Sequence, residues 1–87
     1  MKSTEVTIKN KYGIHARVAH ELVEKCAKFK SEISFCKENT CAKGSSILEI
    51  LMLGSEKGSQ LKIRAVGEDE NNAIQELDKY FADGGGI

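Results

Sequence analysis

The sequence predicts an α+β fold, an open-faced β-sandwich in which a four-stranded antiparallel sheet carries three helices on one face. Apolar and polar residues alternate in four short segments, so each predicted strand has one apolar face. Two longer segments have apolar residues at helical spacing, and one short apolar segment begins with a helix-capping pattern. A sheet with one apolar face takes all its helices on that face and leaves the other to water.

The first half of the chain predicts the order strand, helix, strand, strand. Val6 and Ile8 alternate with polar neighbours as in a half-buried strand, which Tyr12-Gly13 ends. A helix is expected from residue 16, with an apolar stripe of Ala19, Leu22, Val23, Cys26 and Phe29. A second strand is expected around residues 33–35, and a tight turn at residues 38–39 leads into a third over residues 40–43.

The second half predicts a short helix, a strand and a final helix. Residues 47–53 alone fit either a buried strand or a buried helix. Ser46 and Glu49 form a capping box that favours the helix, and Gly54 suits its end. A fourth strand is expected over residues 61–65. Asp69 is the expected N-cap of the last helix, whose apolar stripe is Ala73, Ile74, Leu77, Tyr80 and Phe81.

Length and composition limit the classes of protein that fit. The 87 residues suffice for one domain, which we expect to span residues 1–83, with a glycine-rich tail at 84–87 that is flexible and does not pack. Thirteen basic residues balance thirteen acidic ones, which argues against a nucleic-acid binder. No apolar run approaches the roughly 18 residues of a membrane span, and the first residues lack a signal core. Three cysteines, an odd count, fit a reducing cytoplasm.

His15 falls where a strand ends and a helix begins. Amides at a helix start lack intrahelical acceptors, so those of Ala16, Arg17 and Val18 are available to bind phosphate. The positive end of the helix dipole disfavours imidazolium, and a neutral ring has a nitrogen lone pair that can attack phosphorus. The Arg17 guanidinium can then hold the added negative charge. An ordinary polar residue at a helix start is the alternative, because many proteins place a histidine there without binding phosphate.

The stretch GIHARVA resembles the active-site signature of the HPr family, the histidine phosphocarriers of the bacterial phosphoenolpyruvate-dependent phosphotransferase system. The resemblance covers nearly the whole chain, including the element order and the segments SSILEILMLGSEKG and GEDENNAIQEL. It implies that His15 accepts a phosphoryl group on Nδ1 from phosphorylated enzyme I and passes it to a histidine of an enzyme IIA-type protein. Arg17 would stabilise the charge. Such a protein is a monomeric carrier, not an enzyme with turnover of its own, and needs no cofactor.

One residue departs from the family signature. The family usually has proline after the arginine, where this chain has Val18. Proline near a helix start fixes φ and removes an amide that would lack a partner. We expect the chemistry to survive the change, with a slightly less rigid helix start.

Ser46 matches the serine that a dedicated kinase phosphorylates in Gram-positive members of the family. The alternative is that Ser46 is simply a helix N-cap. Glu49 supports the cap, stands where the family often has glycine, and would repel a phosphate on Ser46. Transcription regulators are further partners that the resemblance suggests.

The family docks its partners around the histidine, through apolar residues of the short helix and of the first helix start. The corresponding residues are Ala16, His20, Ile47, Leu48 and Leu51. Some of these side chains should be exposed, because a short helix cannot bury all of its apolar residues. An ordinary buried helix and a merely solvated His20 are the alternatives.

Cys36 and Cys41 should face each other across the predicted hairpin, with Phe35 and Ala42 pointing into the core. Cross-strand neighbours are close enough for a disulfide, although its geometry would be strained. In a cytoplasm we expect both to be free thiols, and Cys26 to be a small core residue. The cysteines and histidines lack metal-ligand spacing, so no metal site is expected.

Two alternative functions remain at this point. One is a regulatory HPr-like binding module of the nitrogen-branch or catabolite-control type, which signals by docking without carrying sugar-transport flux. The other is a small-ligand domain with helices on a sheet.

Overall fold

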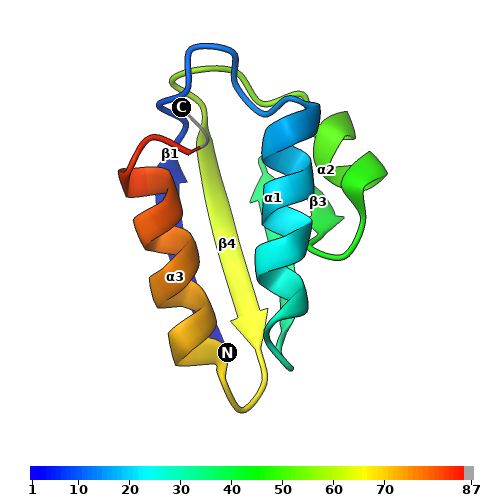
Figure 1. Ribbon diagram of the computed structural model, residues 1–87, viewed down its shortest axis with the longest axis vertical. Coiled ribbons are helices and arrows are strands. Elements are labelled where there is room, and N and C mark those ends of the chain that lie inside the picture. The colour runs from blue at the N-terminus through cyan, green and yellow to red at the C-terminus, as the bar shows by residue number, and fades with distance from the viewer. Residues whose placement is uncertain (86–87) are drawn as a thin grey trace.

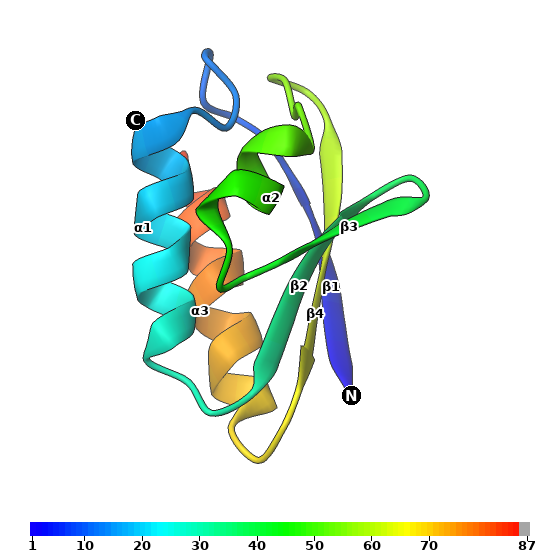
Figure 2. The same cartoon turned by 90° about the vertical axis from the view of Figure 1, so that its right-hand side faces the viewer.

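The four strands and three helices of residues 1–85 form two layers, a sheet and a layer of helices. In the computed structural model, which describes residues 1–85, the elements are β1 (Lys2–Thr7), α1 (Ala16–Ala27), β2 (Glu32–Lys37), β3 (Thr40–Lys43), α2 (Ile47–Met52), β4 (Gln60–Val66) and α3 (Glu70–Ala82). The strands form one antiparallel sheet in the order β1-β4-β2-β3. All three helices cover one face of the sheet (Figures 1 and 2). The predicted fold class and element order are confirmed.

The strand alternation explains why only one face of the sheet is covered. In β4, Leu61, Ile63 and Ala65 are fully buried, whereas Lys62 and Arg64 between them are exposed. Successive side chains of a strand point to opposite faces, so the charged residues stay in water on the open side. The antiparallel neighbours β1 and β2 lie on either side of β4.

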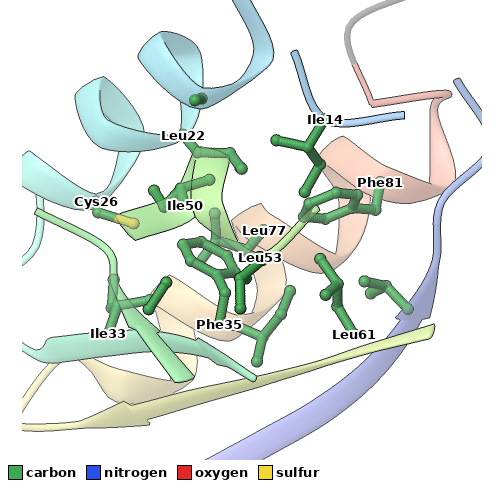
Figure 3. Packing of buried hydrophobic residues seen from close by; sticks show 14 of the residues in the cluster. Ile14, Leu22, Cys26, Ile33, Phe35, Ile50, Leu53, Leu61, Leu77 and Phe81 are labelled. Atoms are coloured by element: carbon green, nitrogen blue, oxygen red, sulfur yellow. The ribbon is translucent and has the colours of Figure 1, made fainter. Parts of the chain in front are cut away.

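Each helix contributes at least one fully buried apolar side chain to a common core. Leu22 from α1, Ile50 from α2 and Leu77 from α3 gather over Phe35 and Leu61 of the sheet (Figure 3). Complete burial of such a side chain stabilises the fold by about 1.5–3 kcal/mol. The core therefore fixes the position of all three helices over the sheet.

Two apolar residues of the predicted elements lie just outside them. Ile8 follows the end of β1, yet it is buried, and its backbone pairs with Ser59 (N–O 2.9 Å) and Gly58 (N–O 2.8 Å) in the loop before β4. Phe29 follows the end of α1 and is partly buried against the core. The apolar pattern runs past the ends of both elements, because the residues that follow them also pack against the core.

Asp69 occupies the predicted N-cap position of α3 but makes no cap bond to this helix. Its carboxylate instead accepts hydrogen bonds from the amides of Lys30 (2.8 Å) and Ser31 (2.9 Å) and from the Ser31 hydroxyl. The Ser31 hydroxyl, followed by the Lys30 amide, lowers the pKa of Asp69. Asp69 thus ties the loop before β2 to the start of α3, a long-range contact that local sequence does not signal.

The glycine run after α3 packs in part. Gly84 and Gly85 are buried, and the side-chain amide of Asn10 donates to the Gly85 carbonyl (3.3 Å). The expectation that this run does not pack is wrong for these two residues, because the chain turns back toward the loop after β1. Gly86 and Ile87 lie outside the described residues.

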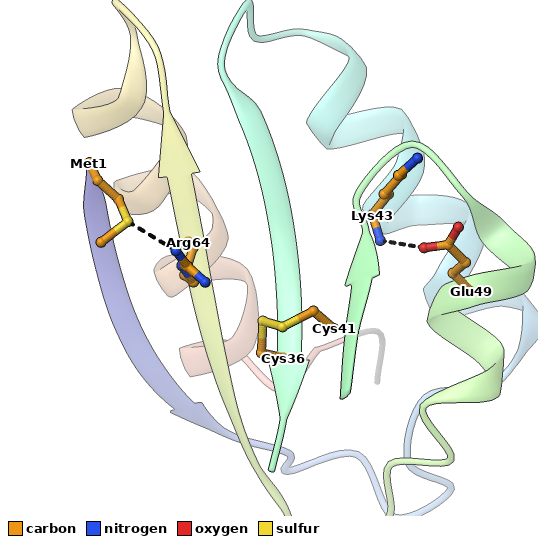
Figure 4. The surroundings of a disulfide bond; sticks show 6 residues. All are labelled: Met1, Cys36, Cys41, Lys43, Glu49 and Arg64. Atoms are coloured by element: carbon orange, nitrogen blue, oxygen red, sulfur yellow. Dashed lines mark hydrogen bonds between the residues drawn. A yellow bond between two sulfur atoms is a disulfide. The ribbon is translucent and has the colours of Figure 1, made fainter. Parts of the chain in front are cut away.

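The β2–β3 hairpin has the predicted register and an unexpected covalent bond. Phe35 and Ala42 pair across the strands and point into the core, as predicted. Cys36 and Cys41 also pair directly, and a disulfide joins them (Figure 4). The expectation of two free thiols is therefore wrong for this structure, because it was inferred from a reducing compartment and not from the predicted register, which places the two sulfur atoms within bonding reach. Cys26 is a buried free cysteine, and burial raises its pKa to about 12.

Candidate functional site

The loop between β1 and α1 is fixed closely against the loop before β4. Gly13 has φ +68°, a left-handed conformation, and a Cβ at this position would lie only 2.3 Å from the Ser55 carbonyl oxygen. The next residue, Ile14, donates its amide to the same carbonyl (3.1 Å) and buries its side chain. These contacts set where the following residue, His15, enters the helix.

His15 is the N-cap residue of α1, as predicted. Its backbone is extended (φ −109°, ψ −177°), and its carbonyl accepts the Ala19 amide (2.9 Å), the bond that begins the helix. The His15 side chain makes no cap hydrogen bond, and the first turn of the helix contains no acidic residue. By helix geometry the amides of residues 16–18 have no acceptor within the helix, and the first turn supplies no acidic side chain against the positive end of the dipole.

The His15 ring is half-buried and is approached from one side by the β1–α1 loop. The Asn10 side-chain nitrogen Nδ2 lies 3.5 Å from Nε2 of His15. The Tyr12 ring meets the imidazole edge-on, with centroids 6.4 Å apart. The Asn10 contact uses Nε2, the ring nitrogen opposite the predicted phosphoryl acceptor Nδ1.

Arg17 is exposed on α1, where it lines a shallow cleft between α1 and α3. Glu21 and Tyr80 line the same cleft, and the Tyr80 hydroxyl donates to Glu21 Oε1 (2.7 Å). Burial and this hydrogen bond raise the pKa of Tyr80, while the positive charge of Arg17 acts in the opposite direction. Arg17 thus lies one helical turn from Glu21 and two residues from His15, and its role at the histidine stays a prediction.

Among the predicted docking residues of α2, two are exposed and one is not. Ile47 is 38% exposed and Leu48 67%, whereas Leu51 is partly buried against the core. Met52, which no pattern in the sequence singled out, is 74% exposed at the end of the same helix. We call Ile47, Leu48 and Met52 the α2 apolar surface.

On α1, the predicted docking residues Ala16 and His20 are both exposed. His20 Nε2 lies 3.6 Å from Glu24 on the same helix. Tyr12, 73% exposed in the preceding loop, is a further apolar surface residue that the sequence did not signal, because a loop has no periodicity. Figure 1 shows the beginning of α1 beside α2, and the two helices are in contact. The predicted docking residues therefore lie near His15 on adjoining elements.

Ser46 is the N-cap of α2, and its side chain is engaged in that cap. Ser46 Oγ accepts the Glu49 amide (3.2 Å). The second bond of the predicted capping box does not form, because the Glu49 carboxylate accepts the Lys43 amide instead (2.9 Å; Figure 4). The short helix is confirmed, and Glu49 connects it to the edge strand β3.

Two absences apply to the part of the chain that the structure describes. Residues 1–85 contain no group of three or more His, Cys, Asp or Glu side chains placed to hold a metal ion. None of the helices in that range has the length and apolar character needed to cross a membrane.

The fold and the helix start define a class: a small α+β sandwich that presents a half-buried histidine at the N-cap of its first helix, where the first turn has no acidic residue. Comparison with known proteins makes the assignment specific. A family model described as "PTS HPr component phosphorylation site" matches residues 2–83. This chain belongs to the HPr family.

Several HPr relatives align with this chain over nearly the whole length of both proteins. The phosphocarrier protein HPr of Xylella fastidiosa is 33% identical over 81 residues, which cover 93% of this chain and 91% of that protein. A crystal structure of HPr from Thermoanaerobacter tengcongensis superposes with a TM-score of 0.94 at 38% identity, covering 100% of this chain and 98% of the other. An HPr dimer from the same organism superposes with a TM-score of 0.78, at 38% identity and full coverage of both chains.

Proposed function

We propose that this protein is a phosphocarrier of the bacterial phosphoenolpyruvate-dependent phosphotransferase system. His15 accepts a phosphoryl group on Nδ1 from phosphorylated enzyme I and passes it to a histidine of an enzyme IIA-type protein. The observation that carries the proposal is the half-buried His15 ring at the uncapped start of α1. Membership in the HPr family and the phosphocarrier relatives support it.

The chemistry follows from charge at the helix start. As the Nδ1–P bond forms, the donor nitrogen leaves with the electron pair of the bond that breaks. The phosphorylated ring carries nearly two negative charges, which the amides of Ala16, Arg17 and Val18 and the Arg17 guanidinium can bind. Dipole stabilisation of about 0.3–1 kcal/mol holds the group without trapping it, so the protein is a reaction intermediate with no turnover of its own.

Partners would dock where the α2 apolar surface adjoins the start of α1. Exposed apolar side chains there, with Ala16 and His20 at the edge, fit the apolar surface of a protein partner. Enzyme I and enzyme IIA-type proteins are the partners we propose, with a monomeric carrier in the cytoplasm and no nucleic-acid or membrane partner. An HPr kinase that phosphorylates Ser46 and a transcription regulator are further partners that the structure favours less, because Ser46 Oγ already caps α2.

The test is a phosphoenolpyruvate transfer assay with purified enzyme I. We expect the natural protein to acquire one acid-labile phosphoryl group and His15→Ala to acquire none. His20→Ala is the matched control, since it removes the other histidine of the same helix; because its phosphoryl acceptor is intact, it should still acquire one phosphoryl group, whatever its place at the docking surface does to the rate. Phosphorylation of His15→Ala, or none of the natural protein, would contradict the proposal.

A further inference from the structure

Asn10, which the sequence did not single out, is a buried polar residue in the loop between β1 and α1, with 4% of its surface exposed. Its side chain contacts three separate parts of this end of the molecule, which are the following loop, the histidine and the C-terminal segment. A buried amide is stable only when its polar atoms have partners. The arrangement of those partners determines what the amide offers to His15.

Two contacts fix which way the Asn10 amide points. The Tyr12 backbone amide donates to Asn10 Oδ1 (3.0 Å), so this atom must be the acceptor. Nδ2 donates to the Gly85 carbonyl (3.3 Å), which can only accept. A flipped amide would place two donors together and two acceptors together, so the observed orientation is strongly preferred.

The second hydrogen of Nδ2 faces the imidazole. Nδ2 lies 3.5 Å from Nε2 of His15, at the long end of the hydrogen-bond range. Because Nδ2 can only donate, Nε2 must carry the lone pair for the contact to be favourable. In the unphosphorylated neutral ring, the proton then sits on Nδ1. This proton must shift to Nε2 before the Nδ1 lone pair can attack phosphorus, and Nε2 releases it after the Nδ1–P bond has formed.

We propose that Asn10 is a positioning residue that holds Nε2 of His15 as a hydrogen-bond acceptor and thereby slows the loss of a phosphoryl group from Nδ1. The inference rests on the proposed function, in which Nδ1 is the atom phosphorylated. When the phosphoryl group occupies Nδ1, an uncharged ring has its lone pair on Nε2. This is the form that the amide of Asn10 matches.

The link to phosphoryl loss is the protonation of Nε2. Hydrolysis is fast when Nε2 takes a proton first, because the ring then leaves as neutral imidazole. The Nδ1–P bond breaks, its electron pair returns to Nδ1, and a water oxygen bonds to phosphorus and releases its proton. A proton on Nε2 would face the Asn10 donor hydrogen, so Asn10 opposes the first step.

The first experiment measures the tautomer of His15 in the unphosphorylated protein by ¹⁵N nuclear magnetic resonance. We expect the neutral ring to carry its proton on Nδ1 in the natural protein. In Asn10→Asp, a carboxylate that can only accept should move the proton to Nε2. A proton on Nε2 in the natural protein would overturn the proposal, and this reading needs no variant to fold.

The second experiment measures how long the phosphoryl group stays. Protein phosphorylated by enzyme I and phosphoenolpyruvate is separated from enzyme I, and the release of inorganic phosphate is followed at neutral pH. We expect release from Asn10→Asp to be about tenfold faster than from the natural protein. The variant loses the donor that opposes a proton on Nε2 and gains a carboxylate that accepts a hydrogen bond from protonated Nε2. Asn39→Asp, the same change at the exposed hairpin turn, should match the natural protein.

Equal release from Asn10→Asp and the natural protein would overturn the inference while leaving the carrier function intact. Failure of enzyme I to phosphorylate any of the three proteins would instead overturn the proposed function. In that case the tautomer measurement still decides whether Asn10 holds Nε2 as an acceptor.

Discussion

The starts of α1 and α2 each carry a candidate phosphorylation residue at the N-cap, but they differ in what their amides bind. At α1, the His15 side chain makes no cap bond, and the first turn has no acidic residue. At α2, Ser46 Oγ accepts the Glu49 amide, and the Glu49 carboxylate lies in the first turn. The first turn of α1 thus supplies neither a cap from its N-cap side chain nor a negative charge, whereas the start of α2 supplies both.

This difference shows why a helix N-terminus alone does not define a phosphate site. The dipole and the amides without acceptors inside the helix are common to both helices. What distinguishes α1 is an N-cap residue, His15, whose side chain makes no cap bond and is contacted by residues outside the helix. Arg17, a cation, follows two positions later. We therefore expect variants at the two starts to separate phosphoryl chemistry from stability.

Removing the cation at α1 should have the largest effect. Arg17→Ala should lower the rate of His15 phosphorylation by about 10- to 100-fold, because a charge-assisted hydrogen bond to phosphate is lost. The unfolding midpoint should change little, since Arg17 is exposed. Initial rates with enzyme I and phosphoenolpyruvate measure the effect. Arg64→Ala on the open sheet face is the control, and an equal loss there would contradict a local role for Arg17.

Reducing the Cys36–Cys41 disulfide should have the second largest effect. This bond closes a loop with a sequence separation of 5, and loss of such a short closure should lower the free energy of unfolding by about 2 kcal/mol. Urea unfolding with and without dithiothreitol measures it, and Cys36→Ser/Cys41→Ser should not respond to the reductant.

Hydrogen exchange extends this test to the two helix starts. Ser46 and Glu49 both bond to Lys43 of β3, so amides of α2 should lose protection on reduction while those of α1 keep it. Equal loss at both helices would show that the hairpin does not support α2 selectively.

Removing the cap at α2 should change stability and spare the chemistry. Ser46→Ala should lower the free energy of unfolding by about 1 kcal/mol, because the Glu49 amide loses its acceptor. Ser46→Asp, which can still cap, should stay within a few tenths of a kcal/mol. Thermal unfolding measures both variants. Ser45→Ala is the control, because Ser45 is the neighbouring serine and is not the N-cap of α2. A tenfold change in His15 phosphorylation in Ser46→Ala would break the separation between the two starts.

Introducing the family's proline should have the smallest effect. Val18 is buried (1% exposed), so Val18→Pro removes some apolar packing from the core and lowers stability. Proline also restricts the unfolded chain, which raises stability. Because the two effects oppose each other, the free energy of unfolding should shift by no more than about 1 kcal/mol. The transfer rate should also remain close to that of the natural protein. A large gain in the rate would show that valine at this position limits the chemistry.

Local pattern was enough to predict most of the fold and the place of His15 in it. Alternation placed Phe35 and Ala42 in the core, and the change of period at residue 16 located His15 at a helix start. Asn10, whose partners include Tyr12 and Gly85, could not be predicted in the same way, because its contacts depend on how a loop and the C-terminal segment meet.

Side-chain partners separated in sequence were also missed. The hydrogen bonds of Asp69 to the loop before β2, and the choice of Glu49 between two amides, depend on packing between elements. The disulfide was missed for a different reason. The register was predicted correctly, but its redox state was inferred from an expected compartment and not from geometry.

The close approach of Gly13 to the Ser55 carbonyl has a consequence for genetics. Any side chain at position 13 would push the loop before α1 away from the loop before β4, and His15 would move with it. An allele that replaces Gly13 should thus encode a protein that is phosphorylated poorly, although His15 itself is unchanged. Second-site suppressors of such an allele should map to residues 54–58, where the chain can retreat, and not to the body of α1.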